Sequence, residues 1–395
     1  MELCEIANIV GIDKYPGELD AVYEQLKETD ALACDLELID RLQTEHDIFG
    51  QYYDTVRKTA VAINADEARS AWVKAAVSFV MDADVEKART LPVPKPDGTT
   101  VTDLLPLYIL LPQIPVSIED YRHRGFSEEE LQGLLGAYKA GMRIVEQQTG
   151  RPGINHVYYH WLTLFAKAAI FKTGGLQFEL QKLPGTALWL RNRQSGQVVP
   201  VMVKGRFHAS GIQPLGSLGY EDDTGAFAAE FSEDEEKFCG HGAYDSVVDA
   251  QSRVFLKSEW ECIARPGDKC LGMHIPRGAD ISRKAIAGAC AAAKEIALQQ
   301  YPEYASGGIF CASWLLDPTL GKLLGEQSKI AGFSSSFVKF PNKSTGMDGF
   351  LFVFQKPVEN FVDLPENTSL QRKLKKLFLD GGGMRNYSGI ILLKE

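Results

Sequence analysis

The sequence has few of the features that mark a membrane, secreted or nucleic-acid-binding protein. No apolar run approaches the roughly 20 residues needed to cross a bilayer, so we expect no membrane span. The first 20 residues are acidic and lack the basic start and cleavage site of a secretory signal. Lysine and arginine number 42 against 52 aspartates and glutamates, a formal net charge of −10. This balance argues against a nucleic-acid or anionic-membrane surface, because each requires a basic face.

Cysteine is also sparse and irregular. Seven cysteines are spread over 395 residues without a CxxC pair. Such an odd, scattered set fits reduced thiols better than a disulfide framework, so we expect a cytoplasmic protein. The phosphate-binding patterns GxxxxGK[ST] and GxGxxG are absent as well. The chain is nevertheless long and apolar enough, with 45% hydrophobic residues, to form two domains.

The first part of the chain has a helical hydrophobic pattern. Apolar residues recur every three or four positions with polar faces between them, which predicts amphipathic helices. Ser127 and Glu130 form a capping box that marks the start of one helix. The stretch 104–121 contains three prolines, so we expect it to be broken into short helical or extended pieces.

The pattern changes after residue 172. Short alternating runs rich in β-branched and aromatic residues follow, bounded by Gly, Asn or Pro, which predicts strands. From residue 270 onward helices return between strands, which requires an α/β layer with at least one parallel pair. The sequence therefore predicts an α+β fold: an all-helical N-terminal domain over residues 1–150 and an α/β domain with a central mixed sheet over residues 151–395.

Three late segments have less distinctive patterns. We expect the apolar run 349–356 to be a strand and the run 388–395 to supply an edge strand. The basic amphipathic helix 369–379 is short and lies in an acidic protein, so we expect it to pack on the sheet rather than to bind a membrane.

The stretch 270–301 carries the clearest functional pattern, a strand, a turn and an Ala-rich helix. Pro276 ends the strand because it cannot donate to a ladder. Gly278 allows a sharp turn and close approach of a ligand to the backbone, and Asp280 or Ser282 can cap the helix. The first N–H groups of that helix could bind a phosphate, although an ordinary capped helix has the same pattern. Three basic side chains lie close by in the sequence: Arg277, Arg283 and Lys284.

The order of elements around this turn resembles the GNAT acyltransferase fold. The segments "HIPRGADIS" (274–282), "FCASWLLDPTLGKLL" (310–324) and "EQSKIAGF" (326–333) are also similar to the C-terminal half of a bacterial two-domain acyltransferase family. In that family a helical N-terminal domain precedes a GNAT-like C-terminal domain. The resemblance is strongest over residues 255–353 and implies transfer of an acyl group to a small-molecule acceptor, expected to bear an amine.

The resemblance also implies a cofactor site, for acetyl-CoA or another acyl-CoA. The strand 270–276 would run beside the pantetheine arm, and residues 310–316 would diverge from it to leave a slot for the thioester. The implied cofactor-binding residues are Met273, Ile275, Arg277, Gly278, Ala279, Asp280, Ile281, Ser282 and Arg283. The mechanism requires no metal, and the helical domain would cover the acceptor site.

Two departures from the family pattern leave a second hypothesis open. Only Arg277 and Gly278 remain of the usual pyrophosphate loop (Q/R)xxGx(G/A), and residues 319–333 contain no tyrosine to protonate the leaving thiolate. A catalytically inactive module that keeps the fold and binds a ligand would show the same departures.

Four residues are candidates for the chemistry of acyl transfer, which needs a base and a proton donor. His274 at the strand end is the first candidate for the base. Glu259 and Glu261 share a face of one predicted strand and could act as base and amine anchor, or simply form a polar outer face. Ser313 could protonate the thiolate. Each could instead be structural; for His274, the alternative is a hydrogen bond to a neighbouring carbonyl.

Two further groups suggest other chemistries. Cys239, His241 and Asp245 lie close together in "FCGHGAYDS", which suggests a thiol-dependent hydrolase, although the glycines favour a plain loop. His156 and His160 lie four apart on one helix face, a spacing that zinc proteases use. The glutamate that would act as base is missing there and no third ligand is evident, so we expect no metal site.

Overall fold

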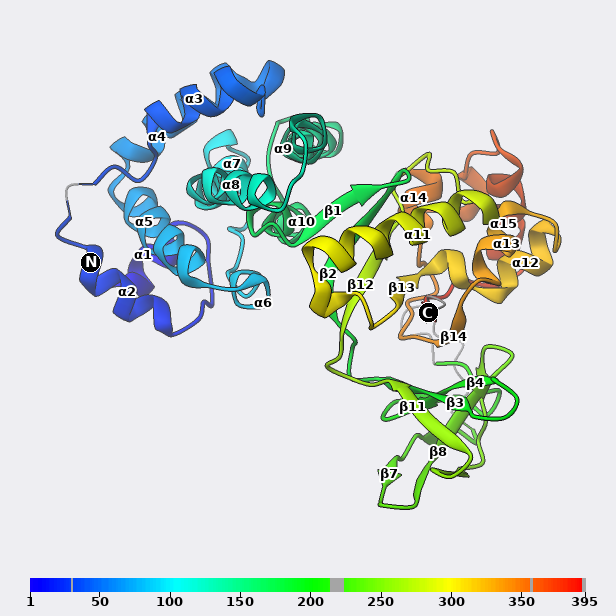
Figure 1. Cartoon of the computed structure of the whole chain (residues 1–395). Helices are drawn as coiled ribbons and strands as arrows, with labels where there is room; N and C mark the ends of the chain where they lie inside the picture. The colour runs from blue at the N-terminus through cyan, green and yellow to red at the C-terminus, as the bar shows by residue number, and fades with distance from the viewer. Residues whose placement is uncertain (30, 214–223, 356–357, 393–395) are drawn as a thin grey trace. The chain divides into compact units, whose positions relative to one another are not determined.

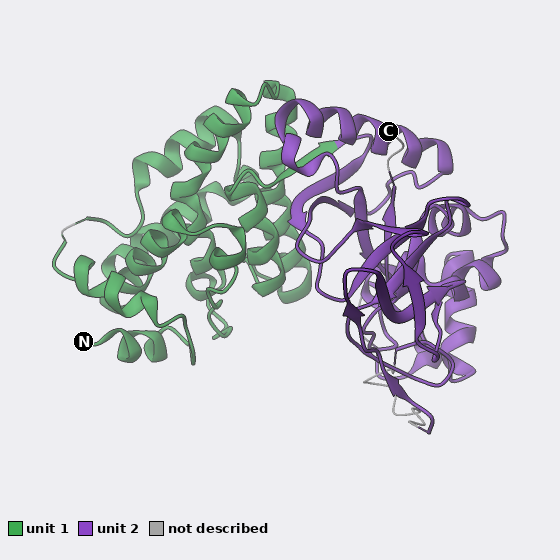
Figure 2. Ribbon diagram, turned by 60° about the horizontal axis from the view of Figure 1, so that its bottom comes forward, with its two compact units in different colours: residues 1–172 green, residues 173–395 purple. Residues whose placement is uncertain are grey.

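The computed structural model describes residues 1–29, 31–213, 224–355 and 358–392. The chain divides into two compact units, Met1–Lys172 and Thr173–Glu395 (Figure 2). The first is helical and the second contains the sheets, so the expected α+β fold is confirmed. The division falls after Lys172, later than the boundary expected after residue 150, because helix α10 (His156–Ala166) packs on α7, α8 and α9 of the first unit.

Unit 1 is a helical assembly. Its helices are α1 (Leu3–Ile9), α2 (Glu18–Leu26), α3 (Leu36–His46), α4 (Tyr53–Ala65), α5 (Glu67–Asp82), α6 (Val85–Ala88), α7 (Thr100–Leu110), α8 (Ile114–His123), α9 (Glu128–Thr149) and α10, with short 3-10 turns η1 (Gly50–Tyr52) and η2 (Leu111–Gln113). The predicted capping box opens α9: the Ser127 N–H donates to Glu130 Oε2 at 2.8 Å, and the Glu130 N–H donates to Ser127 Oγ at 3.3 Å.

Helices α7 and α8 form the apolar centre of unit 1. The stretch 104–121 is divided into short helical pieces, as expected: α7 ends at Leu110, and Pro112 and Pro115 lie in the first turns of η2 and α8. The three pieces follow one another directly and form one continuous helical path. The path Thr100–His123 has the length and apolar composition of a membrane span, which we did not expect from the sequence. However, 72% of its most apolar window is buried within the protein, as in the core helix of a globular domain.

Unit 2 contains a six-stranded mixed sheet (Figure 1), apart from the first three residues of β1, which belong to unit 1. Its order is β1 (Ile170–Thr173), β2 (Leu176–Lys182), β12 (Lys269–His274), β13 (Ile309–Ser313), β15 (Tyr387–Ile391) and β14 (Val338–Pro341). Strands β12 and β13 are parallel, whereas β2·β12, β13·β15 and β14·β15 are antiparallel. The expected edge strand, β15, instead lies between two others. Its position follows from its burial, because Tyr387–Ile390 are all buried and an edge would expose one side.

Helices cover this sheet and extend from its end. They are α11 (Arg283–Gln300), α12 (Pro318–Leu324), α13 (Lys329–Ser334), α14 (Phe350–Phe354) and α15 (Ser369–Leu379), with 3-10 turns η3 (Pro302–Tyr304), η4 (Trp314–Leu316) and η5 (Phe361–Asp363). Within the run 349–356, expected as a strand, residues 350–354 form α14, because Phe350 and Phe354 are one helical turn apart and both pack on Phe378. Residue 356 lies outside the described residues. The basic helix α15 packs on α12, α14 and η5, and not on the sheet as expected.

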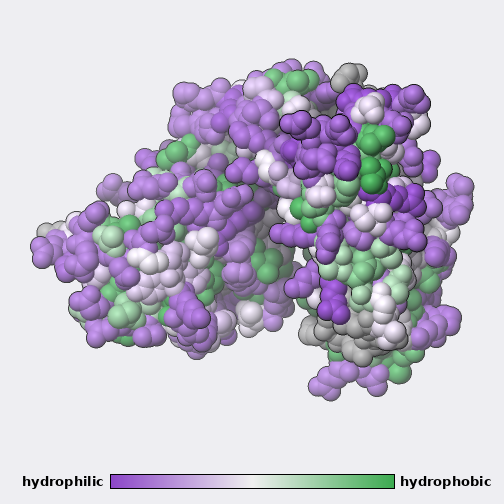
Figure 3. Space-filling model, turned by 90° about the horizontal axis from the view of Figure 1, so that it is seen from below, coloured by the Kyte–Doolittle hydropathy of each residue, from purple (hydrophilic) through white to green (hydrophobic). Residues whose placement is uncertain are grey.

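A second, seven-stranded sheet is inserted between β2 and β12. It contains β3 (Ala187–Asn192), β4 (Val198–Met202), β7 (Ser232–Glu233), β8 (Lys237–Tyr244), β9 (Val247–Val248), β10 (Arg253–Leu256) and β11 (Trp260–Ala264), beside the small pair β5 (Arg206–Phe207) and β6 (Phe227–Ala228). Trp189 joins the two sheets: its ring packs on Phe310 and Phe340, and its indole N–H donates to the Val338 carbonyl at 3.2 Å. The face of the molecule in Figure 3 is mostly hydrophilic, with smaller hydrophobic patches.

Candidate functional site

Strands β12 and β13 start side by side and then part. Their parallel ladder consists of two residue pairs, of which Gly272↔Phe310 is the last. Beyond it β12 remains paired with β2 as far as His274, and β13 remains paired with β15 as far as Ser313. The two strands therefore diverge at their carboxyl ends, where the sequence predicts a slot. We call this opening the β12–β13 gap.

Backbone groups of both strands face the β12–β13 gap. The Leu271 N–H donates to the Gly308 carbonyl at 3.2 Å, which fixes the direction of the ladder. The groups next in line beyond the last pair are the Met273 carbonyl and the Ala312 N–H, and the ladder ends before it joins them. Ala312 is exposed although it lies on an inner strand. The gap thus presents an acceptor on one side and a donor on the other, which an amide-containing ligand can pair with.

A histidine–carboxylate pair stands beside the gap. His274 Nε2 lies 2.7 Å from Glu179 Oε2 of β2. The Glu179 side chain is 9% exposed and the His274 side chain is 36% exposed, so the carboxylate is buried behind an imidazole that solvent reaches. An ionised carboxylate only accepts, so this contact favours the tautomer with its proton on Nε2 and its lone pair on Nδ1. His274 thus has an acidic partner on β2, and its role as the general base stays a prediction.

The sequence did not identify Glu179 as a functional residue. It belongs to the alternating run "LQFELQKL", in which the pattern indicates only that the glutamate lies on a polar outer face of a strand. Register brings it to the site: Glu179 lies opposite Gly272, and His274 lies opposite Gln177. A Cβ at Gly272 would come within 2.6 Å of Gln181 Nε2, so the glycine lets that carboxamide lie across β12 on the same face.

The predicted strand–turn–helix follows His274. Gly278 has φ +84°, a conformation that favours glycine, and a Cβ there would have no atom within 4 Å. The Ala279 N–H donates to the Pro276 carbonyl at 3.1 Å, which closes the turn. Ser282 caps α11, since its hydroxyl accepts from the Ala285 N–H at 3.4 Å. The turn is therefore open to solvent at the positive end of an 18-residue helix.

An acidic side chain lies at the start of this helix. Asp280 Oδ1 accepts from the Ser282 N–H at 3.1 Å and from Lys329 Nζ at 3.0 Å. The ammonium of Lys329, together with the Ser282 donors, holds the pKa of the Asp280 carboxyl below its usual value. An anion that binds at this turn would therefore lie near the Asp280 carboxylate, which already accepts the Ser282 N–H, and near the Lys329 ammonium.

The remaining residues implied as cofactor ligands line the same segment. The Arg277 guanidinium donates to the Gln355 carboxamide oxygen, with Nη1 at 3.0 Å from it. The Gln355 amide is oriented so that its oxygen faces the guanidinium, because its nitrogen would face another donor there. Arg283 Nη2 donates to Ser335 Oγ at 3.2 Å. Met273 is buried, whereas Ile275 and Ile281 are partly exposed around the turn.

Ser313 lies at the end of β13, on the sheet face opposite His274. The pairing Gly272↔Phe310 places His274 and Ala312 on one face and Ser313 on the other. Its hydroxyl oxygen accepts from the Leu315 N–H at 3.1 Å, so Ser313 caps η4. The two candidates, the base and the proton donor, therefore flank the gap from opposite faces.

Glu259 and Glu261 were expected to share one strand, but they do not. The run read as one strand divides at a turn: β10 ends at Leu256, Glu259 lies in the turn, and β11 begins at Trp260. The Glu261 carboxylate binds Arg191 at 2.6 Å and Arg193 at 2.9 Å. A turn joins β11 to the start of β12, and His274 lies at the other end of β12, about 17 Å along the strand. The structure does not bring either glutamate to the gap.

The structure places the cysteine–histidine group on a strand and the turn that follows it. The segment expected as a loop is strand β8, and Asp245 lies in the turn after it with φ +48°. His241 Nδ1 lies 3.0 Å from the Asp249 carbonyl oxygen, and its ring stacks on Phe227. The histidine is thus held in place by contacts other than Cys239.

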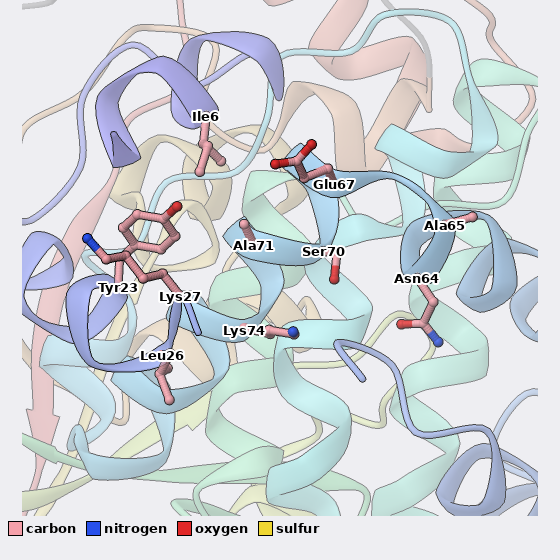
Figure 4. A pocket seen from close by; sticks show the side chains of 10 residues that line it. All are labelled: Ile6, Tyr23, Leu26, Lys27, Asn64, Ala65, Glu67, Ser70, Ala71 and Lys74. Carbon is pink, nitrogen blue, oxygen red and sulfur yellow. The ribbon is translucent and has the colours of Figure 1, made fainter. Parts of the chain in front are cut away.

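Unit 1 offers no comparable site in the part that the structure describes. The His156 and His160 rings lie 4.1 Å apart, but the described residues contain no cluster of three or more possible metal ligands. A pocket of about 330 Å³ lies between α1, α2, α4 and α5 (Figure 4). Two of its polar groups have partners: Lys74 Nζ donates to the Thr29 carbonyl at 3.0 Å, and the Tyr23 hydroxyl donates to the Met1 carbonyl at 3.0 Å.

Known proteins share this architecture. The family model described as GNAT-like C-terminal domain matches residues 170–391, whereas no curated protein matches the chain. A crystal structure of an acyltransferase in complex with decanoyl-CoA is 18% identical, covers 100% of both chains and has a TM-score of 0.63. A second, with decanoyl-CoA and teicoplanin, is 18% identical over 100% of both chains with a TM-score of 0.60. A third, with CoA and 10C-teicoplanin, is 17% identical over 99% of this chain and 100% of that one, with a TM-score of 0.58.

At these identities the solved structures establish a shared fold, and the likeness extends over both units. The family match is of another kind, since it covers more than half of the residues and includes β1, β12, β13 and β15. It confirms the resemblance found in the sequence. The chain belongs to the family of proteins that carry a GNAT-like C-terminal domain.

Proposed function

We propose that unit 2 binds an acyl-CoA along the β12–β13 gap and transfers the acyl group to a small-molecule acceptor that bears an amine. The observation that carries this proposal is the early end of the parallel ladder at Gly272↔Phe310, while both strands continue. The pantetheine arm contains two amides, which match the Met273 carbonyl and the Ala312 N–H on the sides of the gap. The diphosphate would then lie at the turn 277–282, near the N-terminus of α11.

The solved neighbours support this choice of cofactor. They are acyltransferases with decanoyl-CoA or CoA bound, and two of them also hold teicoplanin or its acylated form. By that analogy we propose that this chain accepts medium-length acyl groups as well as acetyl. The acidic net charge of −10 favours a cationic, amine-bearing acceptor, without identifying it.

The contact between His274 and Glu179 supports the chemistry that we propose for His274. The acceptor nitrogen attacks the thioester carbonyl carbon, the C–S bond breaks, and His274 Nδ1 takes the proton that the nitrogen loses. Glu179 stabilises the resulting imidazolium from the buried side. The thiolate leaves on the CoA side of the gap and takes a proton from water or from the Ser313 hydroxyl, which solvent re-protonates. His274 then gives its proton back to solvent. No step requires a metal.

Two measurements test the proposal. Calorimetric titration with CoA and decanoyl-CoA should show binding, and Arg277→Ala should weaken it. CoA thiol release from decanoyl-CoA in the presence of a panel of amines should depend on His274, with His274→Ala reducing the rate roughly 10²-fold or more. Binding without release for any amine would favour the inactive binding module, and absence of CoA binding would refute the cofactor assignment.

A further inference from the structure

Helix α14 lies between the segments that follow the two diverging strands. At its start, Gly349 has φ +77° and lies directly against the Trp314 indole, where a Cβ would overlap the ring. Trp314 is the first residue after β13. At its end, Gln355 holds the Arg277 guanidinium, three residues after β12. Parallel strands end at the same edge of a sheet, so α14 lies at the edge where the β12–β13 gap opens.

The helix is fixed on one side and apolar on the other. Phe350 and Phe354 are 5% and 3% exposed and pack on Phe378. Of the three residues between them in the sequence, two point outward: Leu351 is 58% exposed and Phe352 is 74% exposed. A large apolar pair held outward on an anchored helix is a feature that needs an explanation.

We propose that Leu351 and Phe352 contact the pantetheine arm of the bound acyl-CoA. This inference rests on the proposed function, because that function places the diphosphate at the turn 277–282 and the thioester in the gap beside Ala312. The arm must connect these two points, and α14 joins the same two points on the protein. The arm carries a geminal dimethyl group and methylene units, whose burial against a leucine and a phenylalanine is favourable.

The positions of Arg277 and Trp314 at the two ends of α14 favour the pantetheine arm, and not the acyl chain, as the group that α14 contacts. Arg277 lies at the diphosphate end and Trp314 at the thioester end, so α14 follows the part of the cofactor that every acyl-CoA shares. We therefore expect the contact to strengthen CoA and all acyl-CoA thioesters equally, and to leave ligands without an arm unaffected.

Calorimetric titration of the full chain with two ligands tests this. CoA carries the pantetheine arm, and adenosine 3′,5′-bisphosphate does not. The double variant Leu351→Ala/Phe352→Ala should weaken CoA binding roughly tenfold and leave binding of the bisphosphate unchanged, since loss of two apolar contacts costs on the order of a factor of ten. The matched control is Leu298→Ala, which removes a 57%-exposed leucine near the far end of α11 and should change neither affinity.

The other outcomes overturn the inference. Equal loss of CoA and bisphosphate binding would show that α14 acts only by holding Arg277. Loss confined to decanoyl-CoA, with CoA unaffected, would assign the two side chains to the acyl chain, and no change with any ligand would leave them without a role in binding. If wild-type protein binds neither CoA nor decanoyl-CoA, the proposed function itself fails, which is a separate result.

Discussion

The Glu179 carboxylate lies 2.7 Å from the His274 imidazole across the antiparallel strands β2 and β12. The pair is one-sided, because the carboxylate is buried and the imidazole reaches solvent. If His274 is the base, as we propose, the buried carboxylate would orient its ring and would place a negative charge behind it when it becomes protonated. We therefore propose that Glu179 positions His274. This role can be tested separately from any contribution of Glu179 to the stability of the fold.

Glu179→Gln should lower kcat for acyl transfer at least about tenfold while the protein remains folded. Glutamine has nearly the same shape and can still accept from Nε2, but it carries no charge to stabilise the imidazolium. For the same reason the pH–rate profile of the variant should differ from that of the wild type. Rates measured from pH 5 to 9, beside the melting temperature, provide the check.

Glu261→Gln is the matched control for this prediction. Glu261 binds Arg191 and Arg193 on the second sheet, so its loss should leave the rate and its pH profile unchanged. A lower rate in Glu179→Gln without any change of profile would point to a structural role only.

Asp280→Asn should tighten CoA binding by a few fold. The Asp280 carboxylate is exposed at the start of α11 and already accepts from the Ser282 N–H, so it repels and competes with an incoming diphosphate. Asparagine keeps an oxygen for the loop and removes the charge. The gain should shrink between 50 mM and 500 mM salt, because exposed charges are screened. Weaker binding at every salt concentration would contradict this account of the turn.

The sequence was informative wherever function depends on a local pattern. Pro276, Gly278 and Ser282 define the end of a strand, the turn and the helix cap through their own backbone preferences, and His274 precedes them directly. The positions of these residues at the strand end, in the turn and at the helix cap could be predicted without knowing which strands pair. The gap itself was expected only through the family resemblance.

The residues missed or misplaced depend on long-range pairing. Glu179 is 95 positions from His274 in the sequence, and the second sheet lies between them along the chain, so only the β2·β12 register brings them together. Glu259 and Glu261 were misplaced because one run contains two strands that pair with different partners, β8 and β3. In α14 the run "FLFVF" is uniformly apolar, and neither a period of two nor one of 3.6 can be recognised in it.

Lys339 should make the stability of unit 2 depend on pH in the alkaline range. Burial lowers the pKa of Lys339 from 10.5 to about 8, while its ammonium donates to the Ser334 carbonyl and hydroxyl oxygens. Between pH 8 and 10.5 the unfolded chain therefore binds more protons at this site than the folded protein does. The contribution of Lys339 to the free energy of unfolding then rises with pH over this window, by at most about 3 kcal/mol.

The comparison with Lys339→Met isolates this effect from other groups that titrate in the same range. Wild type should gain stability relative to the variant as pH rises from 8 to 10, in urea denaturation followed by fluorescence. A difference between the two proteins that stays constant with pH would show that Lys339 has an ordinary pKa in the folded state.

Alkylation should separate the acyltransferase from a thiol-dependent enzyme. Burial raises the pKa of Cys270, Cys290 and Cys311 to about 12, so these thiols should resist iodoacetamide in the native protein, whereas the exposed Cys4 should react. Cys239→Ser should keep full transfer activity, because His241 is bonded to the Asp249 carbonyl and the acyl group is passed directly to the acceptor. Mass spectrometry of the labelled protein, read beside its rate of CoA release, tests both statements. If modification of Cys239 abolished activity in step with its labelling, and Cys239→Ser were inactive yet folded, the chemistry would lie on β8 and not at the gap.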